Sequence, residues 1–330
     1  MQTVGSGDRR AGQNASLLDL LGSVGQLVAQ RVRRRRTAAQ VHETTNLQAA
    51  RAVMRDYWKR QGLADATIEY FIRDAFDYPG YVDVVERAER RWGSLAGKRV
   101  LDLGCGWGSL SVFLAAARAD VTFIDRVPEH VQVARLRVPG GTGLVGDARE
   151  LLAVGHDSNG AFDHVFAHAV IEHVGNEPTH RGPAGPSLAA KGSVLKEIHR
   201  LLKPGGTAFV STGNFQFPLD GEIKTWFFHW LPEREQTRLL AAMGIEADNY
   251  GLLSWDELDS LIRQAALQID AVETSDPSSY VLLLQFVSIV VGRARTRHRL
   301  SRLQIERMRA LMESEPQFMS SWYAFLRRAV

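Results

Sequence analysis

Three glycines alternate with other residues in the segment Asp102–Gly108, which lies between a short apolar run and a helical pattern. Glycine lets the backbone turn sharply and lets a ligand approach closely. The helix that follows offers free amide groups in its first turn. A dinucleotide-binding loop uses the spacing G-x-G-x-x-G around a pyrophosphate. Here the third glycine, Gly108, comes one residue early, and a carboxylate, Asp102, stands two residues before the first. The spacing therefore argues against a pyrophosphate ligand.

The carboxylate of Asp102 would repel a pyrophosphate and attract a cation. S-Adenosylmethionine carries an ammonium, a sulfonium and no phosphate, so it suits this loop better. Asp125 follows Gly108 by 17 residues, at the end of a second expected strand, where a carboxylate can accept both ribose hydroxyls. Asp147 and Ala148 end a third strand, where a side-chain acceptor would bind the exocyclic amine of adenine. The alternative role for both aspartates is helix N-capping, which is compatible with ligand binding.

The elements that must position these residues alternate between strand and helix. Short apolar strands are expected at 99–103, 121–124, 164–167 and 207–211, and a further strand is expected to end at 144–145. Helices are expected at 109–117, 128–135 and 194–202. This alternation predicts an α/β fold with a doubly wound, mostly parallel sheet. A helix at 255–266, with Ser254 as its N-cap, and a strand at 269–274 extend the pattern. Aromatic-rich helices are expected at 45–92, and a helical tail at 293–325.

Composition shifts divide the chain into four expected parts. They are a basic arm at 1–44, partly disordered or helical, a helical cap at 45–95, a catalytic domain that binds S-adenosylmethionine at 96–275, and a mainly helical C-terminal extension at 276–330. The catalytic domain carries an aromatic insertion at 213–250.

Five motifs occur in order along the middle of the chain: VLDLGCGWGSLSVFLA, FIDRVPEHVQVAR, GDARELL, FDHVFAHAVIEHV and LLKPGGTAFVST. Over roughly residues 99–211 this series resembles class I S-adenosylmethionine-dependent methyltransferases, in the small-molecule branch that includes the ubiquinone-biosynthesis O-methyltransferases. The resemblance implies a Rossmann-like fold and S-adenosylmethionine as methyl donor. The predicted donor contacts are Asp102, Gly104, Cys105, Gly106, Trp107, Gly108, Asp125, Arg126, Asp147, Ala148 and His168, the last facing the methionine end.

The segment after the fourth strand departs from the quinone enzymes that it resembles. In those enzymes another acidic residue precedes the Glu-His pair, and together they bind magnesium. Here that place is Ala169, although Glu172 and His173 are retained. A hard cation needs several oxygen ligands, and one carboxylate with one imidazole is a poor site. We therefore predict no metal, and we expect a structural hydrogen-bonding role for the pair.

Histidines supply the candidate catalytic groups. If the acceptor is a hydroxyl or phenol, a base near the transferred methyl group removes its proton, and the ordinary pKa of histidine suits that task. His168 and His173 are the predicted bases, and His229 in the later insertion is a further candidate. The alternative for each is a polar side chain that only satisfies its own hydrogen bonds. A neutral amine acceptor would need no base.

Two segments outside the common motifs are expected to select the acceptor. Residues 176–192 are rich in proline and glycine, too irregular for a helix, and predicted to form a lid. Residues 215–232 are rich in aromatic side chains that could roof an apolar pocket or merely pack an auxiliary core. We predict O-methylation of a small apolar or aromatic metabolite or a sugar conjugate. The alternatives are N- or C-methylation of a metabolite, an RNA-directed methyltransferase, or a non-catalytic cofactor-binding module.

Composition bears on the class of protein, on its location and on its binding partners. The 330-residue chain is 45% apolar and 23% charged, as in ordinary globular proteins. Its single cysteine, Cys105, excludes an internal disulfide and suits the cytoplasm. No signal peptide or membrane-spanning segment is predicted, so we expect a soluble, cytoplasmic protein. Arginines 31 and 33–36 follow an amphipathic pattern that could touch a membrane or stay solvated. Nucleic acid is disfavoured because no Pro-Pro-aromatic motif is present, and oligomeric state is left open.

Overall fold

A computed structural model describes residues 46–77, 80–151, 159–176, 181–218, 227–243, 249–274, 319 and 321–330. Its strands are β1 (Arg99–Leu103), β2 (Asp120–Asp125), β3 (Thr142–Val145), β4 (Phe162–His168), β5 (Arg181–Pro183), β6 (Leu202–Gly213), β7 (Tyr250–Leu252), β8 (Leu267–Thr274) and β9 (Ser321–Arg328). Its α-helices are α2 (Leu47–Arg60), α3 (Asp65–Asp77), α4 (Gly80–Trp92), α5 (Ser109–Ala116), α6 (Pro128–Arg137), α7 (Leu188–Leu201), α8 (Glu233–Met243) and α9 (Trp255–Gln264). The expected basic arm at 1–44, and the extension at 276–318, lie outside the described residues.

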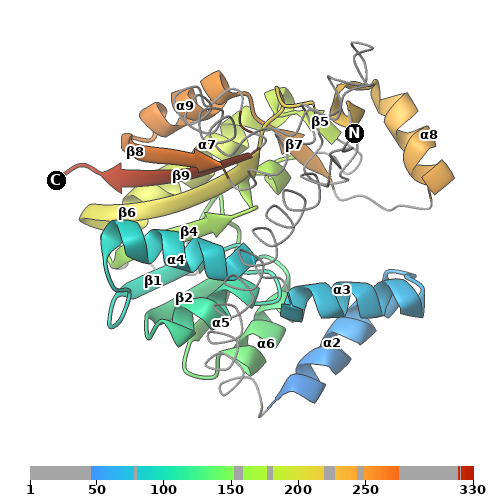
Figure 1. Ribbon diagram of the computed structural model, residues 1–330, viewed down its shortest axis with the longest axis horizontal. Coiled ribbons are helices and arrows are strands. Elements are labelled where there is room, and N and C mark those ends of the chain that lie inside the picture. The colour runs from blue at the N-terminus through green and yellow to red at the C-terminus, as the bar shows by residue number, and fades with distance from the viewer. Residues whose placement is uncertain are drawn as a thin grey trace, which may run out of the picture.

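A seven-stranded sheet has the strand order β3-β2-β1-β4-β6-β9-β8. Its strands from β2 to β8 can be followed in this order in Figure 1. β1, β2, β3, β4 and β6 pair in parallel, so their carboxyl ends share one edge of the sheet. The register sets Asp102 beside Phe123 on β2 and His168 beside Ser211 on β6. The predicted α/β fold with a mostly parallel, doubly wound sheet is confirmed.

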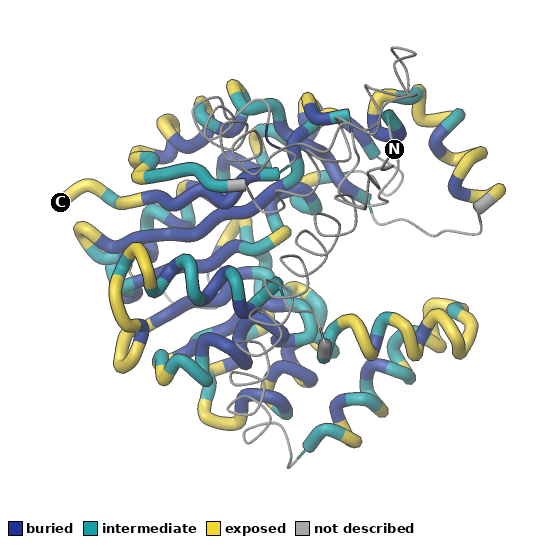
Figure 2. Tube along the Cα trace, viewed as in Figure 1, coloured by how far each residue is buried: buried dark blue, intermediate teal, exposed yellow. Residues whose placement is uncertain are grey.

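Helices cover both faces of this sheet. α7 and α9 pack on one face with Leu101, Val165 and Val210, while α4, α5 and α6 pack on the other with Val100, Phe123, Phe166 and Phe209. Figure 2 shows the strands as a buried band between these layers. α2 and α3 form a smaller core against α6, centred on Met54, Ile72 and Val133. Within the described residues, no helix has the length and apolar character needed to cross a bilayer.

The predicted helical ending of the chain is wrong for residues 321–328. They form β9, which runs antiparallel between β6 and β8. Trp322, Tyr323, Ala324, Phe325 and Leu326 are all buried, because a strand in the interior of a sheet has helices over both faces. The central sheet therefore extends beyond the expected domain boundary at residue 275.

The expected irregular loop at 176–192 is also partly wrong. Residues 181–183 form β5, which pairs with β7 in a separate two-stranded sheet. A 3-10 turn, η4 (Gly185–Ser187), leads directly into α7, so this helix starts at Leu188, six residues earlier than expected. Residues 177–180 lie outside the described chain. A mobile lid here stays a prediction.

Candidate active site

The glycine loop follows β1 at the carboxyl edge of the sheet. Gly104, Gly106 and Gly108 have φ values of +71°, +51° and +78°, which other residues rarely adopt. A Cβ at Gly104 would lie 2.5 Å from Val170 Cγ2, and one at Gly108 would lie 2.7 Å from the Cβ of Ala134. The loop is thus confined by neighbouring segments on two sides. Backbone conformation favours glycine at all three positions, and close approach requires it at Gly104 and Gly108.

Asp125 ends β2 directly beside this loop. Its Oδ2 accepts the Gly106 amide at 2.9 Å, and its Oδ1 accepts the Val127 amide at 2.9 Å and lies 3.2 Å from His130 Nδ1. Burial raises the pKa of Asp125, but the hydrogen bonds and charge of His130 and the two amides outweigh it and hold the pKa below its ordinary value. Asp125 is therefore ionised at neutral pH. It is not the N-cap of α6, a position that Val127 occupies.

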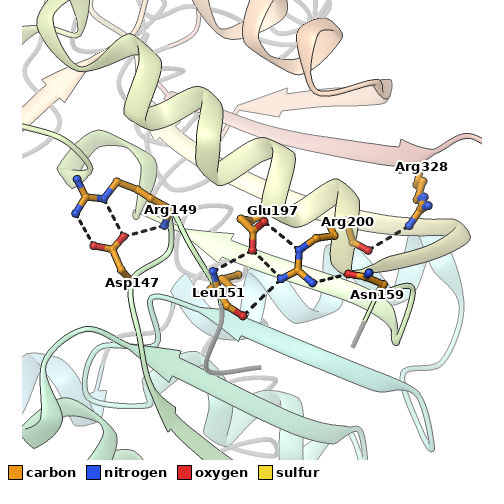
Figure 3. Close-up of polar contacts among 7 residues, drawn as sticks. All are labelled: Asp147, Arg149, Leu151, Asn159, Glu197, Arg200 and Arg328. Atoms are coloured by element: carbon orange, nitrogen blue, oxygen red, sulfur yellow. Dashed lines mark hydrogen bonds and ion pairs between the residues drawn. The ribbon is translucent and has the colours of Figure 1, made fainter. Parts of the chain in front are cut away.

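Asp147 lies just beyond β3, with its carboxylate turned towards Arg149 (Figure 3). It accepts the Arg149 amide at 2.8 Å and the guanidinium at 2.9 and 2.6 Å. These hydrogen bonds lower the pKa of Asp147. Arg126 is exposed, and its charge lowers the pKa of Asp147 further, while Ala148 packs against the core. The predicted contact of Asp147 with the adenine amine stays a prediction.

Asp102 is 2% exposed, and its carboxylate accepts a hydrogen bond from Ser111 Oγ of α5 at 2.5 Å. Burial, with the nearby charge of Asp125, raises the pKa of Asp102 to about 7. Burial also raises the pKa of Cys105 well above its ordinary value, so that thiol stays protonated. Asp102 thus lies beneath the loop, in contact with α5. A direct contact with the donor stays a prediction.

His168 is the last residue of β4. Its ring lies 5.4 Å from Tyr81, 6.1 Å from Phe209 and 6.0 Å from Tyr323, measured between centroids. Its Nε2 is buried and has no hydrogen-bond partner among the described residues. Burial lowers the pKa of His168 to about 4. The imidazole is therefore neutral near pH 7, as a general base must be, but the lowered pKa makes it a weaker base than the ordinary histidine on which the prediction relied.

The segment after β4 is fixed by hydrogen bonds. Ala169 has a φ of +53°, and its amide donates to Ser211 Oγ at 2.9 Å. Glu172 and His173 form a 3-10 turn, η3 (Ile171–His173), in which Glu172 is 2% exposed. The His173 Nδ1 lies 3.0 Å from the carbonyl of Asn249. His173 thus has a hydrogen-bonding contact, whereas Oε2 of Glu172 has no partner among the described residues, and the structural hydrogen-bonding role expected for the pair stays a prediction.

Lys191 belongs to the same region and was not singled out from the sequence. Although fully buried on α7, it donates from Nζ to the carbonyls of Ile171, Glu172 and Val174 at 2.6, 3.1 and 3.1 Å. Burial lowers its pKa to about 8. The sequence did contain a signal for its burial. Lys191 lies three, four and seven residues before apolar side chains of α7, and this spacing places it on the buried face of the helix.

The aromatic insertion, together with Arg181 and Pro183, lines an open pocket of about 570 Å³. The carbonyl of Phe215 accepts from Trp230 Nε1 at 2.7 Å and lies 3.0 Å from Nε2 of His229, which is 1% exposed. The pocket is lined by Arg181, Pro183, Phe215, His229, Trp230, Leu231, Pro232, Glu233 and Gln236. None of the predicted donor contacts lines it, so it is a space apart from the glycine loop. Residues 219–226 of the insertion lie outside the described chain.

Comparison with known proteins places these features in context. Residues 101–210 match a family model described as a methyltransferase domain. The ubiquinone biosynthesis O-methyltransferase of Pseudomonas aeruginosa (strain UCBPP-PA14) is 40% identical over 122 residues, which make up 36% of this chain and 46% of that protein. The protein of the same name from Xanthomonas oryzae pv. oryzae (strain PXO99A) is 38% identical over 121 residues, or 36% and 45% of the two chains. The match thus spans about half the length of these curated relatives.

Solved structures of low sequence identity are also similar. The Burkholderia thailandensis 1,6-didemethyltoxoflavin-N1-methyltransferase is 16% identical with a TM-score of 0.44, covering 84% of this chain and 88% of that one. An S-adenosylmethionine-dependent methyltransferase from Mesorhizobium loti is 17% identical with a TM-score of 0.44, covering 74% and 98%. The match at residues 101–210 confirms the resemblance that the sequence indicated: this segment is similar to methyltransferase domains.

Proposed function

We propose that the chain is an S-adenosylmethionine-dependent methyltransferase that O-methylates a small molecule. The observation that carries the proposal is the pairing of Asp125 with the Gly106 amide at the carboxyl edge of the sheet. An ionised carboxylate beside a loop of left-handed glycines suits a nucleoside that carries two ribose hydroxyls and no phosphate. When bound there, S-adenosylmethionine supplies an electrophilic methyl group on a sulfonium.

The residues around the loop fit this donor. Asp125 would hold the ribose hydroxyls, and the glycine backbone would face the methionine portion. Asp147 and Ala148 lie beyond β3, where the adenine would extend. Asp102 lies buried beneath the loop, and its ionised form, which predominates only above a pH of about 7, adds negative potential that favours a cationic donor over a phosphate. The main catalytic contribution of such a site is alignment of the acceptor with the methyl group and exclusion of water.

His168 is the better candidate for general base. Its Nε2 accepts no hydrogen bond within the described chain, and burial keeps the ring neutral. His173, in contrast, already contacts the Asn249 carbonyl through Nδ1. An acceptor hydroxyl placed at His168 Nε2 would pass its proton to that nitrogen as the oxygen bonds to the methyl group. His229 contacts the Phe215 carbonyl and lines the separate pocket.

The aromatic insertion supports an acceptor with an aromatic or apolar body. Its pocket of about 570 Å³ falls within the range of small-molecule pockets, and Phe215 and Trp230 supply flat apolar walls. Neither the glycine loop nor His168 lines this pocket, so it would hold the body of an acceptor and not the reacting hydroxyl. Arg181 and Glu233 in the same wall add charges that an acceptor with polar substituents would meet. The ubiquinone relatives suggest a quinone-like phenol, and a sugar conjugate is compatible. A cytoplasmic location and membrane contact through the basic arm stay proposals.

A methyl-transfer screen with labelled S-adenosylmethionine tests this proposal. The acceptor panel should contain phenols, sugars, amines and RNA. We expect label in a phenol or sugar, and His168→Gln should lower turnover by about 10²–10⁴-fold. His173→Gln serves as the matched control, with a smaller effect. Label in RNA alone would refute the small-molecule assignment. N- or C-methylation of a metabolite would overturn the proposed O-methylation and the role of the histidine, and would leave the fold and the methyl donor unaffected.

A further inference from the structure

Arg137 is the last residue of α6 and is only 3% exposed. Its Nη1 donates to the Trp107 carbonyl at 2.8 Å and to Ser109 Oγ at 3.1 Å. Its Nη2 donates to the Ala75 carbonyl at 3.3 Å, and its guanidinium carbon lies 4.3 Å from the centroid of the Phe76 ring. One buried side chain therefore contacts both the glycine loop and the end of α3.

Further contacts join the same two parts of the molecule. Ser109, the first residue of α5, donates from Oγ to the Ala75 carbonyl at 2.6 Å. Trp107 of the loop packs against Tyr57 of α2 at 5.3 Å and against His130 at 4.2 Å, measured between ring centroids. His130 in turn lies 3.2 Å from the carboxylate of Asp125. A continuous series of contacts thus leads from α2 and α3 to the expected ribose position.

The chemistry of arginine explains why this residue lies at the junction. Its planar group presents several donors in a fixed arrangement, so it can bind two carbonyls of different segments at once. Lysine carries one flexible ammonium and cannot reproduce that geometry. Removal of Arg137 would take this buried donor from the Trp107 carbonyl and would leave the Ala75 carbonyl with Ser109 Oγ alone, which is costly.

We propose that Arg137 is a positioning residue that fastens α2 and α3 to the glycine loop, so that donor binding and cap docking stabilise each other. This inference rests on the proposed function, because the ligand concerned is the methyl donor. Coupling between binding and a structural change is reciprocal. Donor binding should therefore protect residues 46–77, and loosening those helices should weaken donor binding.

Two measurements on three arginine variants test the proposal. S-Adenosylhomocysteine is the probe in calorimetry, and hydrogen exchange of residues 46–77 is measured with and without it. Arg137→Met removes the guanidinium group with its hydrogen bonds, whereas Arg137→Lys keeps the positive charge. Arg135→Met is the matched control, because Arg135 lies on the same helix, is exposed, and donates to the Gly143 carbonyl at 2.6 Å instead.

We expect Arg137→Met to bind the probe about tenfold more weakly, or about 1.4 kcal/mol, and to exchange faster over 46–77. Arg135→Met should match the wild type in both. If Arg137→Met fails to fold, Arg137→Lys and Ser109→Ala should show smaller changes in the same direction. A folded Arg137→Met with wild-type affinity, or with exchange no faster than Arg135→Met, overturns the inference. A wild type that does not bind the probe refutes the proposed function and, with it, the coupling to donor binding. The exchange comparison of Arg137→Met with Arg135→Met then decides only whether Arg137 holds α2 and α3 against the glycine loop.

Discussion

Replacing Asp102 by asparagine should stabilise the protein, and the gain should grow with pH. The pKa of this buried carboxyl is raised from 3.8 to about 7. Between these values the unfolded chain ionises while the folded chain keeps its proton, so stability falls as pH rises through this window. The complete penalty above pH 7 is about 4 kcal/mol. An asparagine side chain at this position would not ionise, and its amide oxygen can still accept from Ser111.

Urea unfolding at pH 5 and pH 8 measures this effect. The stability of Asp102→Asn relative to wild type should be about 2–3 kcal/mol higher at pH 8 than at pH 5. Asp120→Asn is the control, because Asp120 is exposed at the start of β2, and its relative stability should not change between the two pH values. An Asp102→Asn difference that is the same at both pH values would refute the reasoning about burial.

Asp102→Asn also tests whether the negative charge of Asp102 contributes to binding of the methyl donor. If Asp102 acts through negative potential beneath the loop, its replacement by asparagine should weaken binding of the sulfonium donor more than binding of the uncharged thioether product. Calorimetry with S-adenosylmethionine and S-adenosylhomocysteine compares the two ligands. Equal losses would indicate that Asp102 contributes only to the shape of the loop.

Three other predictions concern the loop, the turn after β4 and the metal. Gly108→Ala should lower the free energy of unfolding by about 1–3 kcal/mol, because φ is +78° and the new Cβ would lie 2.7 Å from that of Ala134; an unchanged thermal midpoint would contradict this. Lys191→Met should cost about 3 kcal/mol because three carbonyls lose a buried donor, whereas Lys196→Met on the exposed side of α7 should cost less than about 0.5 kcal/mol in the same urea titration. Turnover should survive EDTA, because Ala169 replaces an acidic ligand; loss of activity that magnesium restores would show that argument to be wrong.

The parallel part of the fold could be predicted because its signals are local. β1, the glycine loop and α5 follow one another within 18 residues, and each has its own pattern of apolar side chains or glycines. The N-cap of α9 could be predicted for the same reason. The Ser254 hydroxyl accepts from the Glu257 amide, and the Glu257 carboxylate accepts from the Ser254 amide.

β9 was missed because its position in the sheet removes the pattern that marks a strand. A strand with one exposed face alternates between apolar and polar residues. Trp322–Leu326 are buried on both faces and therefore form an unbroken apolar run, which periodicity cannot distinguish from a buried helix. The order of β6, β9 and β8 depends on pairing between segments far apart in the chain, and no local signal encodes that.

Residues of the candidate site could be predicted only where the residue type and its spacing from a strand or loop indicate its role. Asp125 and the three glycines follow from spacing along adjacent strands. Arg137 and Lys191 do not, because their partners are carbonyls, and every residue carries one. The packing of α3, α7 and the loops determines which backbone carbonyls lie beside a buried arginine or lysine.

The central claim is that the loop and Asp125 bind the nucleoside of a methyl donor. Calorimetric titration with S-adenosylhomocysteine tests it most directly, with wild type beside Asp125→Ala. The account predicts micromolar or tighter binding to the wild type and a loss of about 1.5–3 kcal/mol in the variant, because two sugar hydroxyls lose a charged acceptor. Absence of binding to the wild type, or equal affinity for a folded Asp125→Ala, would contradict it.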